Sequence, residues 1–278
     1  MKERVTLTLD RDILDKIDRS VDGGKVKNRS HAIEMLLRQA IGIEKPTKGL
    51  ILAGGNGGKL KWFGKESPRS LIEIKGKPLI VYNIELFKKY GIKDIFIAVG
   101  YKSDRIRKAL GDGKKFGVNI IYIEEKNPLG TAGPLRAAKQ YLTETFVMCN
   151  SDELKNIDLD DMFAYHKANK GCATIALTTR KDPSMYGVAV MNGNKVISFV
   201  EKPPKDNAPS NLINAGLYIL DPVVIDYIPE GYARIETDVF PKLASEEELC
   251  GYPFGGQWFD ARTPEKHKIA EDKWRGLI

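Results

Sequence analysis

Short apolar runs alternate with segments of helical periodicity from residue 50 onward. Continuous apolar runs are typical of strands buried on both faces, and alternating strands and helices form mainly parallel sheets covered by helices. This pattern predicts an α/β fold, a Rossmann-like doubly wound domain whose sheet becomes mixed where the pattern turns strand-rich. We expect strands at 50–53, 95–99, 120–123, 146–149, 174–178, 188–191, 196–200 and 213–220, and helices at 78–90, 104–110, 131–141, 159–168 and 264–274.

A glycine-rich stretch follows the first of these strands. Four glycines occupy five positions, and four cations come after them: Gly54, Gly55, Gly57 and Gly58, then Lys59, Lys61, Lys65 and Arg69. Glycine lets backbone N–H groups converge on an anion, and the cations add positive charge. This order predicts a phosphate site, although the spacing matches neither the P-loop nor Gly-x-Gly-x-x-Gly. The alternative is a flexible surface turn with solvated lysines.

Asn150, Ser151 and Asp152 follow a second buried strand. Ligands of doubly wound sheets bind outside the carboxyl ends of the strands. The glycine stretch and this polar triplet both come at such ends. We therefore expect them to meet at one site.

The composition fits a globular chain with anionic ligands. Its 278 residues carry a net charge of +7, which is mild and spread along the chain, so it does not by itself indicate DNA binding. No apolar run approaches the length of a membrane span, no secretory signal opens the chain, and the three cysteines lack metal-ligand spacing. We expect a cytoplasmic protein with reduced cysteines and no membrane partner.

Residues 1–43 form a separate pattern. Polar and apolar side chains alternate over 4–9, which predicts a strand with one buried face, and helical patterns follow at 11–21 and 29–41. A lone strand needs a partner, and the simplest partner is a second copy of the chain, so we expect a homodimer. A linker at 44–48, where Pro46 ends the helical pattern, precedes a large domain at 49–278.

This strand–helix–helix segment resembles the ribbon-helix-helix family of Arc- and MetJ-type repressors. The resemblance rests on the element lengths, on an Arg-x-Thr-x-Thr strand and on an Asn-Arg-Ser sequence that opens the second helix. In that family two strands pair across a dimer and enter the DNA major groove. The resemblance implies double-stranded DNA as a partner, with base edges contacted by Arg4, Thr6 and Thr8 and phosphates near Arg29 and Ser30. A module that only dimerises is the alternative.

The larger domain resembles the nucleotidyltransferases that make nucleotide sugars from a sugar 1-phosphate and an NTP. Seven motifs carry the resemblance in family order over roughly residues 48–272, and they look most like the GDP-mannose pyrophosphorylase branch. They are GGNGGKL (54–60) with PR (68–69), PLGTAGP (128–134), NSD (150–152), YGV (186–188), FVEKP (199–203), NAGLY (214–218) and GQWFD (256–260).

The resemblance implies roles for individual residues. Transfer of the nucleotidyl group would depend on Mg²⁺ held by Asp152 and Asp260. GTP and mannose 1-phosphate are the nearest substrates by analogy, and UTP or dTTP with glucose 1-phosphate stays open. The other implied contacts are the phosphates at Lys59 and Arg69, the nucleotide at Leu52, Ala53, Gly54, Gly55, Gly57, Gly130 and Thr131, and the sugar phosphate at Gly187, Glu201, Lys202 and Asn214.

The motifs that would contact the phosphates and the metal ion depart from the family pattern. Lys59 stands where the family has Arg, Arg69 stands where it has Lys, and the usual Asp-x-Gly-Thr reads Asp-Ala-Arg-Thr at 260–263. Positive charge is kept at both cationic positions, but the arginine fork and the lysine point charge are not equivalent. Nucleotide binding is therefore a firmer expectation than turnover.

Two functions follow from these patterns. The first is a sugar-1-phosphate nucleotidyltransferase dimerised by its N-terminal module. The second is a DNA-binding regulator whose nucleotidyltransferase-like domain senses a nucleotide or nucleotide sugar. Retention of Asp152, Asp260, Glu201 and Lys202 favours the enzyme, because a sensor has less need of both metal carboxylates.

Overall fold

The computed structural model describes residues 5–21, 26, 28–40, 45–54, 67–125 and 127–277. The chain divides into two compact units, Met1–Lys45 and Pro46–Ile278. No helix within these described ranges is both long enough and apolar enough to cross a membrane.

Two helices make up the regular structure of the smaller unit. They are α1 (Arg11–Arg19) and α2 (Arg29–Ala40), and they pack against each other. Ile17 of α1 and Ala32 of α2 are buried. The Arg29 guanidinium, expected near DNA phosphates, is paired within the unit, because its Nε donates to Asp18 Oδ1 at 2.7 Å.

The strand expected at 4–9 is not formed in the described part of that range. Residues 5–10 have no regular secondary structure, and Arg4 lies outside the described residues. A strand needs a neighbour for its backbone N–H and C=O groups, and the single chain offers none here. The prediction of a strand is therefore wrong for the single chain, and Val5 and Leu7 are left 72% and 52% exposed.

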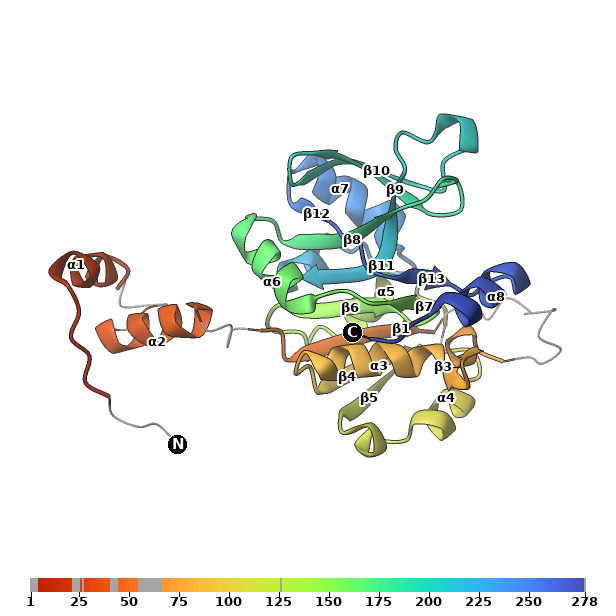
Figure 1. Cartoon of the computed structure of the whole chain (residues 1–278), viewed down its shortest axis with the longest axis horizontal. Helices are drawn as coiled ribbons and strands as arrows, with labels where there is room; N and C mark the ends of the chain where they lie inside the picture. Colours follow the sequence, from red (N-terminus) through yellow and green to blue (C-terminus); the bar gives the residue numbers. More distant parts are fainter. Residues whose placement is uncertain are drawn as a thin grey trace. The chain divides into compact units, whose positions relative to one another are not determined.

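A nine-stranded sheet forms the frame of the larger unit, in the order β5-β4-β1-β6-β11-β8-β12-β10-β9. Figure 1 shows this sheet running from β5 near the bottom of the view to β10 and β9 at the top. The first four strands are parallel: β1 (Lys48–Ala53), β4 (Asp94–Val99), β5 (Asn119–Glu124) and β6 (Phe146–Asn150). The predicted parallel half of the α/β sheet is thereby confirmed.

The other half of the sheet is mixed, as the strand-rich pattern predicts. β11 (Leu212–Leu220) runs antiparallel to both β6 and β8 (Ala173–Thr179), and β9 (Gly187–Asn192) runs antiparallel to β10 (Lys195–Glu201). The sequence gives no sign of β12 (Leu249–Pro253), which lies parallel to β8.

Helices connect the strands largely where periodicity predicts them. They are α3 (Leu79–Lys89), α4 (Ser103–Leu110), α5 (Gly133–Ala137), α6 (Leu159–Ala168), α7 (Phe240–Ser245) and α8 (Pro264–Lys273). The helix expected at 131–141 shrinks to α5, because Thr131 and Ala132 belong to a turn and residues 138–141 continue as further turns. Two small ladders were not predicted: β2 (Glu73–Ile74) with β3 (Lys77–Pro78), and β7 (Glu153–Lys155) with β13 (Trp258–Asp260).

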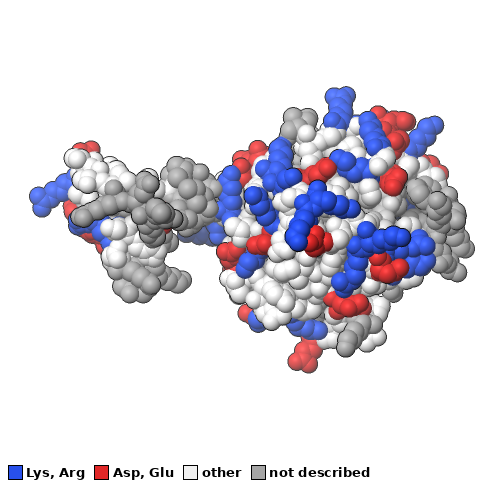
Figure 2. Space-filling view, turned by 90° about the horizontal axis from the view of Figure 1, so that it is seen from below, with Lys and Arg blue, Asp and Glu red and all other residues white. Residues whose placement is uncertain are grey.

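Charged side chains are interspersed over the face of the larger unit that Figure 2 presents. Lys and Arg lie among Asp and Glu there, rather than in a block of one sign. This distribution agrees with the mild positive charge spread along the sequence.

Strand β1 contributes to a separate core on each side of the sheet. Successive strand residues point to opposite faces, so Leu50 packs in the cluster that contains Phe146 and Tyr218, and Ile51 in the cluster that contains Ile84 and Phe87. Both β1 side chains are fully buried. The glycine-rich stretch therefore follows a strand that is anchored by apolar side chains on both faces.

Ile51→Ala should lower the free energy of unfolding by about 2–5 kcal/mol, because it leaves a cavity beneath the strand. The matched control is Ile197→Ala in β10, where the side chain is 51% exposed and the loss should stay below about 1 kcal/mol. Urea denaturation followed by circular dichroism measures both. Equal losses for the two variants would contradict the assigned core.

Candidate active site

The carboxyl ends of β1 and β6 lie side by side. Leu52 is paired with Asn150 in the parallel register, and the Ser151 N–H donates to the Leu52 carbonyl at 3.2 Å. Ala53 and Gly54 therefore leave β1 beside the residues that leave β6. This register places the end of β1 beside the end of β6. Of the glycine stretch, Gly54 is described here, whereas Gly55, Gly57 and Gly58 lie outside the described residues.

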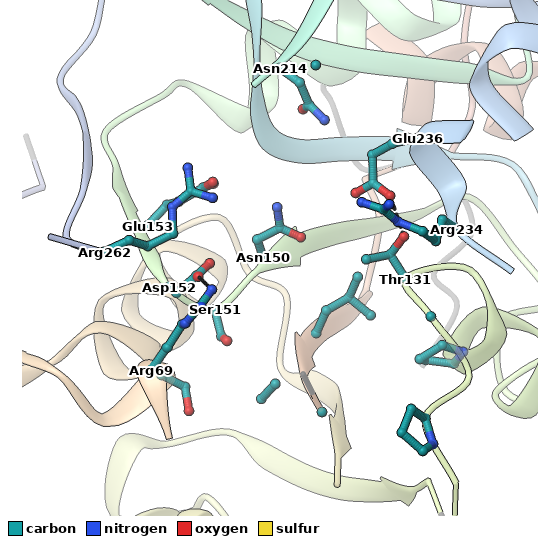
Figure 3. A pocket seen from close by; sticks show the side chains of 18 of the residues that line it. Arg69, Thr131, Asn150, Ser151, Asp152, Glu153, Asn214, Arg234, Glu236 and Arg262 are labelled. Atoms are coloured by element: carbon teal, nitrogen blue, oxygen red, sulfur yellow. Dashed lines mark hydrogen bonds and ion pairs between the residues drawn. The ribbon is translucent and has the colours of Figure 1, made fainter. Parts of the chain in front are cut away.

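A pocket of about 490 Å³ opens at this edge of the sheet. Figure 3 shows Arg69, Asp152, Glu153 and Arg262 on one side of it and Thr131, Arg234 and Glu236 on the other. The structure brings these predicted site residues into one lining: Leu52, Ala53, Gly54, Arg69, Gly130, Thr131, Asp152, Gly187, Glu201, Lys202 and Asn214. Three others, Gly55, Gly57 and Lys59, lie outside the described residues.

Gly130 holds a turn that carries one wall of the pocket. Its φ is +79°, and a Cβ there would come within 2.1 Å of the Ala233 carbonyl oxygen. The next residue, Thr131, donates its hydroxyl to Glu236 Oε2 at 2.5 Å and accepts from the Ile235 N–H at 2.9 Å. This wall is therefore fixed to the π-helical turn Ile235–Val239.

Lys202 and Glu201 stand at the end of β10. Lys202 has a left-handed φ of +50°, which is unusual for a residue with a side chain, and its N–H donates to the Tyr186 carbonyl at 3.0 Å. Its Nζ lies 3.2 Å from Glu201 Oε1, and Arg234 Nη2 lies 3.5 Å from the same oxygen. Glu201 thus holds two cations at the pocket.

Arg69 and Asp152 face each other across the strand ends. Arg69 begins the short 3₁₀ turn Arg69–Leu71, and its Nη1 lies 4.0 Å from Asp152 Oδ2. Asp152 keeps 22% of its side chain exposed. Its carboxylate is therefore open to a ligand in the pocket.

Asp260 lies deeper, and other side chains saturate its carboxylate. Tyr186, Lys266 and Arg262 donate to Oδ2 at 2.6, 2.8 and 3.0 Å. The Arg262 N–H donates to Oδ1 at 3.0 Å. Although burial alone raises the pKa of this carboxyl, the Arg262 and Lys266 cations and the Tyr186 hydroxyl hold that pKa below its usual range.

The predicted metal pair of Asp152 and Asp260 does not fit this arrangement. Asp260 Oδ2 already accepts three donors, two of them cations, and Oδ1 accepts one. The Asp260 side chain has no exposed surface and is not part of the pocket lining, so its carboxylate does not face a metal ion in the pocket. Among the described residues, no group of three or more His, Cys, Asp or Glu is arranged to hold a metal ion. Of the two predicted metal carboxylates, Asp152 is the one with an exposed side chain, at 22%.

Five charged lining residues were not assigned a role from the sequence: Glu125, Glu153, Arg234, Glu236 and Arg262. Glu153 follows Asp152, and Arg262 comes two residues after Asp260. The two side chains come together because the β7–β13 ladder pairs Glu153 with Asp260. Burial raises the pKa of Glu153 to about 7, with the buried Lys155 ammonium, 3.6 Å away, opposing the shift. No periodicity marks three-residue strands, so the sequence offered little signal for this side.

The described lining carries slightly more negative than positive groups. Its carboxyls are Glu125, Asp152, Glu153, Glu201 and Glu236, and its cations are Arg69, Lys202, Arg234 and Arg262, which is five against four. A triphosphate adds several negative charges. A phosphate-rich ligand would therefore need further positive charge, from a bound cation or from residues beyond this lining.

Comparisons with known proteins agree with the geometry. The nucleotidyl transferase family model matches residues 48–268. Mannose-1-phosphate guanyltransferase from Yarrowia lipolytica is 39% identical over 224 residues, 78% of this chain and 61% of that protein. Its namesake from Saccharomyces cerevisiae is 39% identical over 225 residues, 78% of this chain and 62% of that protein. The chain thus spans about three fifths of these relatives.

A solved structure shares the fold of the larger unit. The crystal structure of HddC from Yersinia pseudotuberculosis, complexed with GMP-PN, has a TM-score of 0.69 and 26% identity. The match covers 82% of this chain and 100% of that chain. The α/β fold expected from the sequence is confirmed by this likeness.

Glu236→Gln should change how stability depends on pH. Burial raises the folded-state pKa of Glu236 above its ordinary value, so its contribution is fully present at low pH and is lost as the pH rises through that pKa. Relative to the wild type, the free energy of unfolding of the variant should therefore increase as the pH rises above about 4, the ordinary pKa of a glutamate carboxyl. Glu230→Gln, at an exposed position, is the control, and an equal gain in both variants would contradict burial as the cause.

Proposed function

The chain belongs to the nucleotidyl transferase family, and on that premise we propose that it transfers a nucleotidyl group from an NTP to a sugar 1-phosphate. The products are an NDP-sugar and pyrophosphate. The observation that carries the proposal is that Arg69, Asp152, Glu201, Lys202 and Asn214 line one common pocket at the carboxyl ends of the strands. GTP and mannose 1-phosphate are the favoured pair, because the relatives cited are named mannose-1-phosphate guanyltransferases.

The proposed reaction is an in-line displacement. A phosphate oxygen of the sugar 1-phosphate forms a bond to the α-phosphorus. The bond from that phosphorus to the oxygen that bridges it to the β-phosphorus breaks, and its electron pair leaves with pyrophosphate. Such chemistry needs positioning and charge neutralisation rather than a covalent nucleophile.

The lining supplies both requirements. Arg69 would bind the nucleotide phosphates as a bidentate fork, and Lys202 would bind the sugar phosphate. Glu201 and Asn214 would accept from sugar hydroxyls. Two hydrogen bonds fix the orientation of the Asn214 side chain. Its Oδ1 accepts from the Gly216 N–H at 2.8 Å, and its Nδ2 donates to the Tyr218 hydroxyl at 2.9 Å.

A Mg²⁺ ion fits the residues that remain open. Asp152 would hold it together with phosphate oxygens of the substrate, since Mg²⁺ in phosphate-transfer sites is commonly bound by one or two carboxylates and the phosphates. The ion would supply positive charge against the developing charge on the phosphates. Asp260 takes no part in this proposal.

Pyrophosphate release tests the proposed function. With Mg²⁺ present, GTP and mannose 1-phosphate should give release, and the other NTPs with glucose or N-acetylglucosamine 1-phosphate complete the matrix. Asp152→Ala and Lys202→Ala should each lower kcat/KM roughly a hundredfold, because each removes charge that faces a reacting phosphate. Lys205→Ala is the control, since Lys205 pairs with Asp182 at 3.6 Å outside the lining. No release from any pair would overturn the proposal.

We further infer that the smaller unit dimerises as a ribbon-helix-helix module. Its apolar side chains Val5, Leu7, Ile13, Leu36 and Leu37 are exposed in the single chain, and residues 5–10 lack a strand partner. Pairing two copies of this segment would satisfy the backbone and cover Val5 and Leu7. DNA contact by Thr6 and Thr8 stays a prediction of the resemblance, whereas Arg29 is already paired with Asp18.

Leu7→Glu should dissociate the dimer, because it places a carboxylate in the covered face. Sedimentation of the full chain, which has a mass of 31.1 kDa, should give twice that mass for the wild type and one chain for the variant. Val223→Glu, on an exposed apolar residue of the larger unit, should leave the dimer intact. A monomeric wild type at micromolar concentration would contradict the pairing.

A further inference from the structure

Arg262 stands where the related motif has glycine, and its guanidinium lines the pocket. Its Nη2 donates to Asp260 Oδ2 at 3.0 Å, and its guanidinium carbon lies 5.4 Å from the centre of the Tyr186 ring. The side chain remains 27% exposed. Arginine has five N–H donors, so one bond to Asp260 leaves others directed at the pocket.

Asp260 does not need Arg262 for neutralisation. Lys266 Nζ donates to Asp260 Oδ2 at 2.8 Å and to the Tyr186 hydroxyl at 2.7 Å, which already pairs the carboxylate with one cation. Arg262 is therefore a second cation paired with the single negative charge of Asp260. Burial disfavours its charged form, yet Asp260, Glu153 and Asp152 together raise its pKa, so the guanidinium stays charged.

The lining at this end of the pocket is balanced in charge, with Arg69 and Arg262 against Asp152 and Glu153. Behind the lining, the Lys155 and Lys266 cations outnumber the one carboxylate, Asp260. Figure 3 shows Arg69, Asp152, Glu153 and Arg262 grouped on this side. The rest of the lining is the more negative part, so a phosphate is drawn to this end.

We propose that Arg262 is a phosphate-binding residue that supplies, as a fixed part of the chain, the positive charge that a metal ion on Asp260 would otherwise bring. Asp260, Lys266 and Tyr186 act as positioning residues that orient the guanidinium toward the pocket. This proposal rests on the proposed nucleotidyl transfer and specifies how that site binds phosphate. It also means that Asp260 is not a metal ligand in this chain.

Binding without metal is the first test. Calorimetry in EDTA with inorganic pyrophosphate and with GTP should show binding to the wild type. Arg262→Gln should weaken that binding roughly ten- to a hundredfold, because charge-assisted hydrogen bonds are lost. Arg262→Lys should lose less, since it keeps the charge but not the fork. Arg180→Gln is the matched control, because Arg180 stacks on Trp258 and donates to its carbonyl outside the lining.

Counting bound Mn²⁺ is the second test. Electron paramagnetic resonance of Mn²⁺, in the presence of GTP, should show that Asp260→Asn leaves the affinity for Mn²⁺ unchanged. The double variant Arg262→Gly with Lys266→Met should bind one additional Mn²⁺, because it frees the Asp260 carboxylate. The single variant Lys266→Met should not, since Arg262 still occupies that carboxylate.

Clear outcomes overturn the inference. These are the absence of pyrophosphate and GTP binding in EDTA, equal binding by wild type and Arg262→Gln, or loss of Mn²⁺ affinity in Asp260→Asn. None of these readouts depends on turnover. Failure of pyrophosphate release in every substrate pair, with binding that still depends on Arg262, would refute nucleotidyl transfer and retain Arg262 as a phosphate-binding residue.

Discussion

The parallel pairing of β1 with β6 is the constraint on which the site depends. It places Leu52 opposite Asn150, so the chain leaves both strands at the same edge and in the same direction. Each strand is anchored by apolar side chains on two faces, with Leu50 and Ile51 in separate cores. A shift of one residue in this register would turn every strand side chain to the opposite face. The position of Asp152 relative to Gly54 is therefore determined by the cores rather than by the loops themselves.

Glycine completes this frame where backbone segments must approach closely. At Gly216 the φ is +63°, and a Cβ would lie 2.1 Å from Glu153 Oε2. At Gly54 a Cβ would lie 2.0 Å from Glu125 Oε1. In both cases the space denied to a side chain is occupied by a pocket carboxylate. The glycines of the motifs thus let acidic side chains stand against the backbone, a role different from phosphate binding by N–H groups.

Most strands of the sheet could be predicted, because long apolar runs carry their own signal. The eight strands expected in the larger domain all correspond to observed ones, whereas the strand expected at 4–9 does not, and α6 matches its prediction over Leu159–Ala168. The β7–β13 ladder could not be predicted, since three-residue strands show no periodicity and their pairing joins residues far apart in sequence. The surroundings of Asp260 could not be predicted for the same reason. Asp260 fits the family motif by its position, but its partners Lys266 and Tyr186 are brought to it only by the fold.

A cation that is already bound to a carboxylate differs physically from a solvated cation. A solvated cation has to lose water and side-chain freedom before it can bind a phosphate, whereas a guanidinium already hydrogen-bonded to a buried carboxylate is oriented in advance. Arg262 on Asp260 is such a hydrogen-bonded pair, and the pocket has two looser ion pairs, with Arg69 facing Asp152 at 4.0 Å and Lys202 and Arg234 sharing Glu201. Each carboxylate limits how much net positive charge its cation contributes, which explains why the lining as a whole stays near neutral. In the proposed reaction, the same pairing would keep the cations in place between turnovers, so that phosphate would exchange one set of partners for another without rearrangement of the frame.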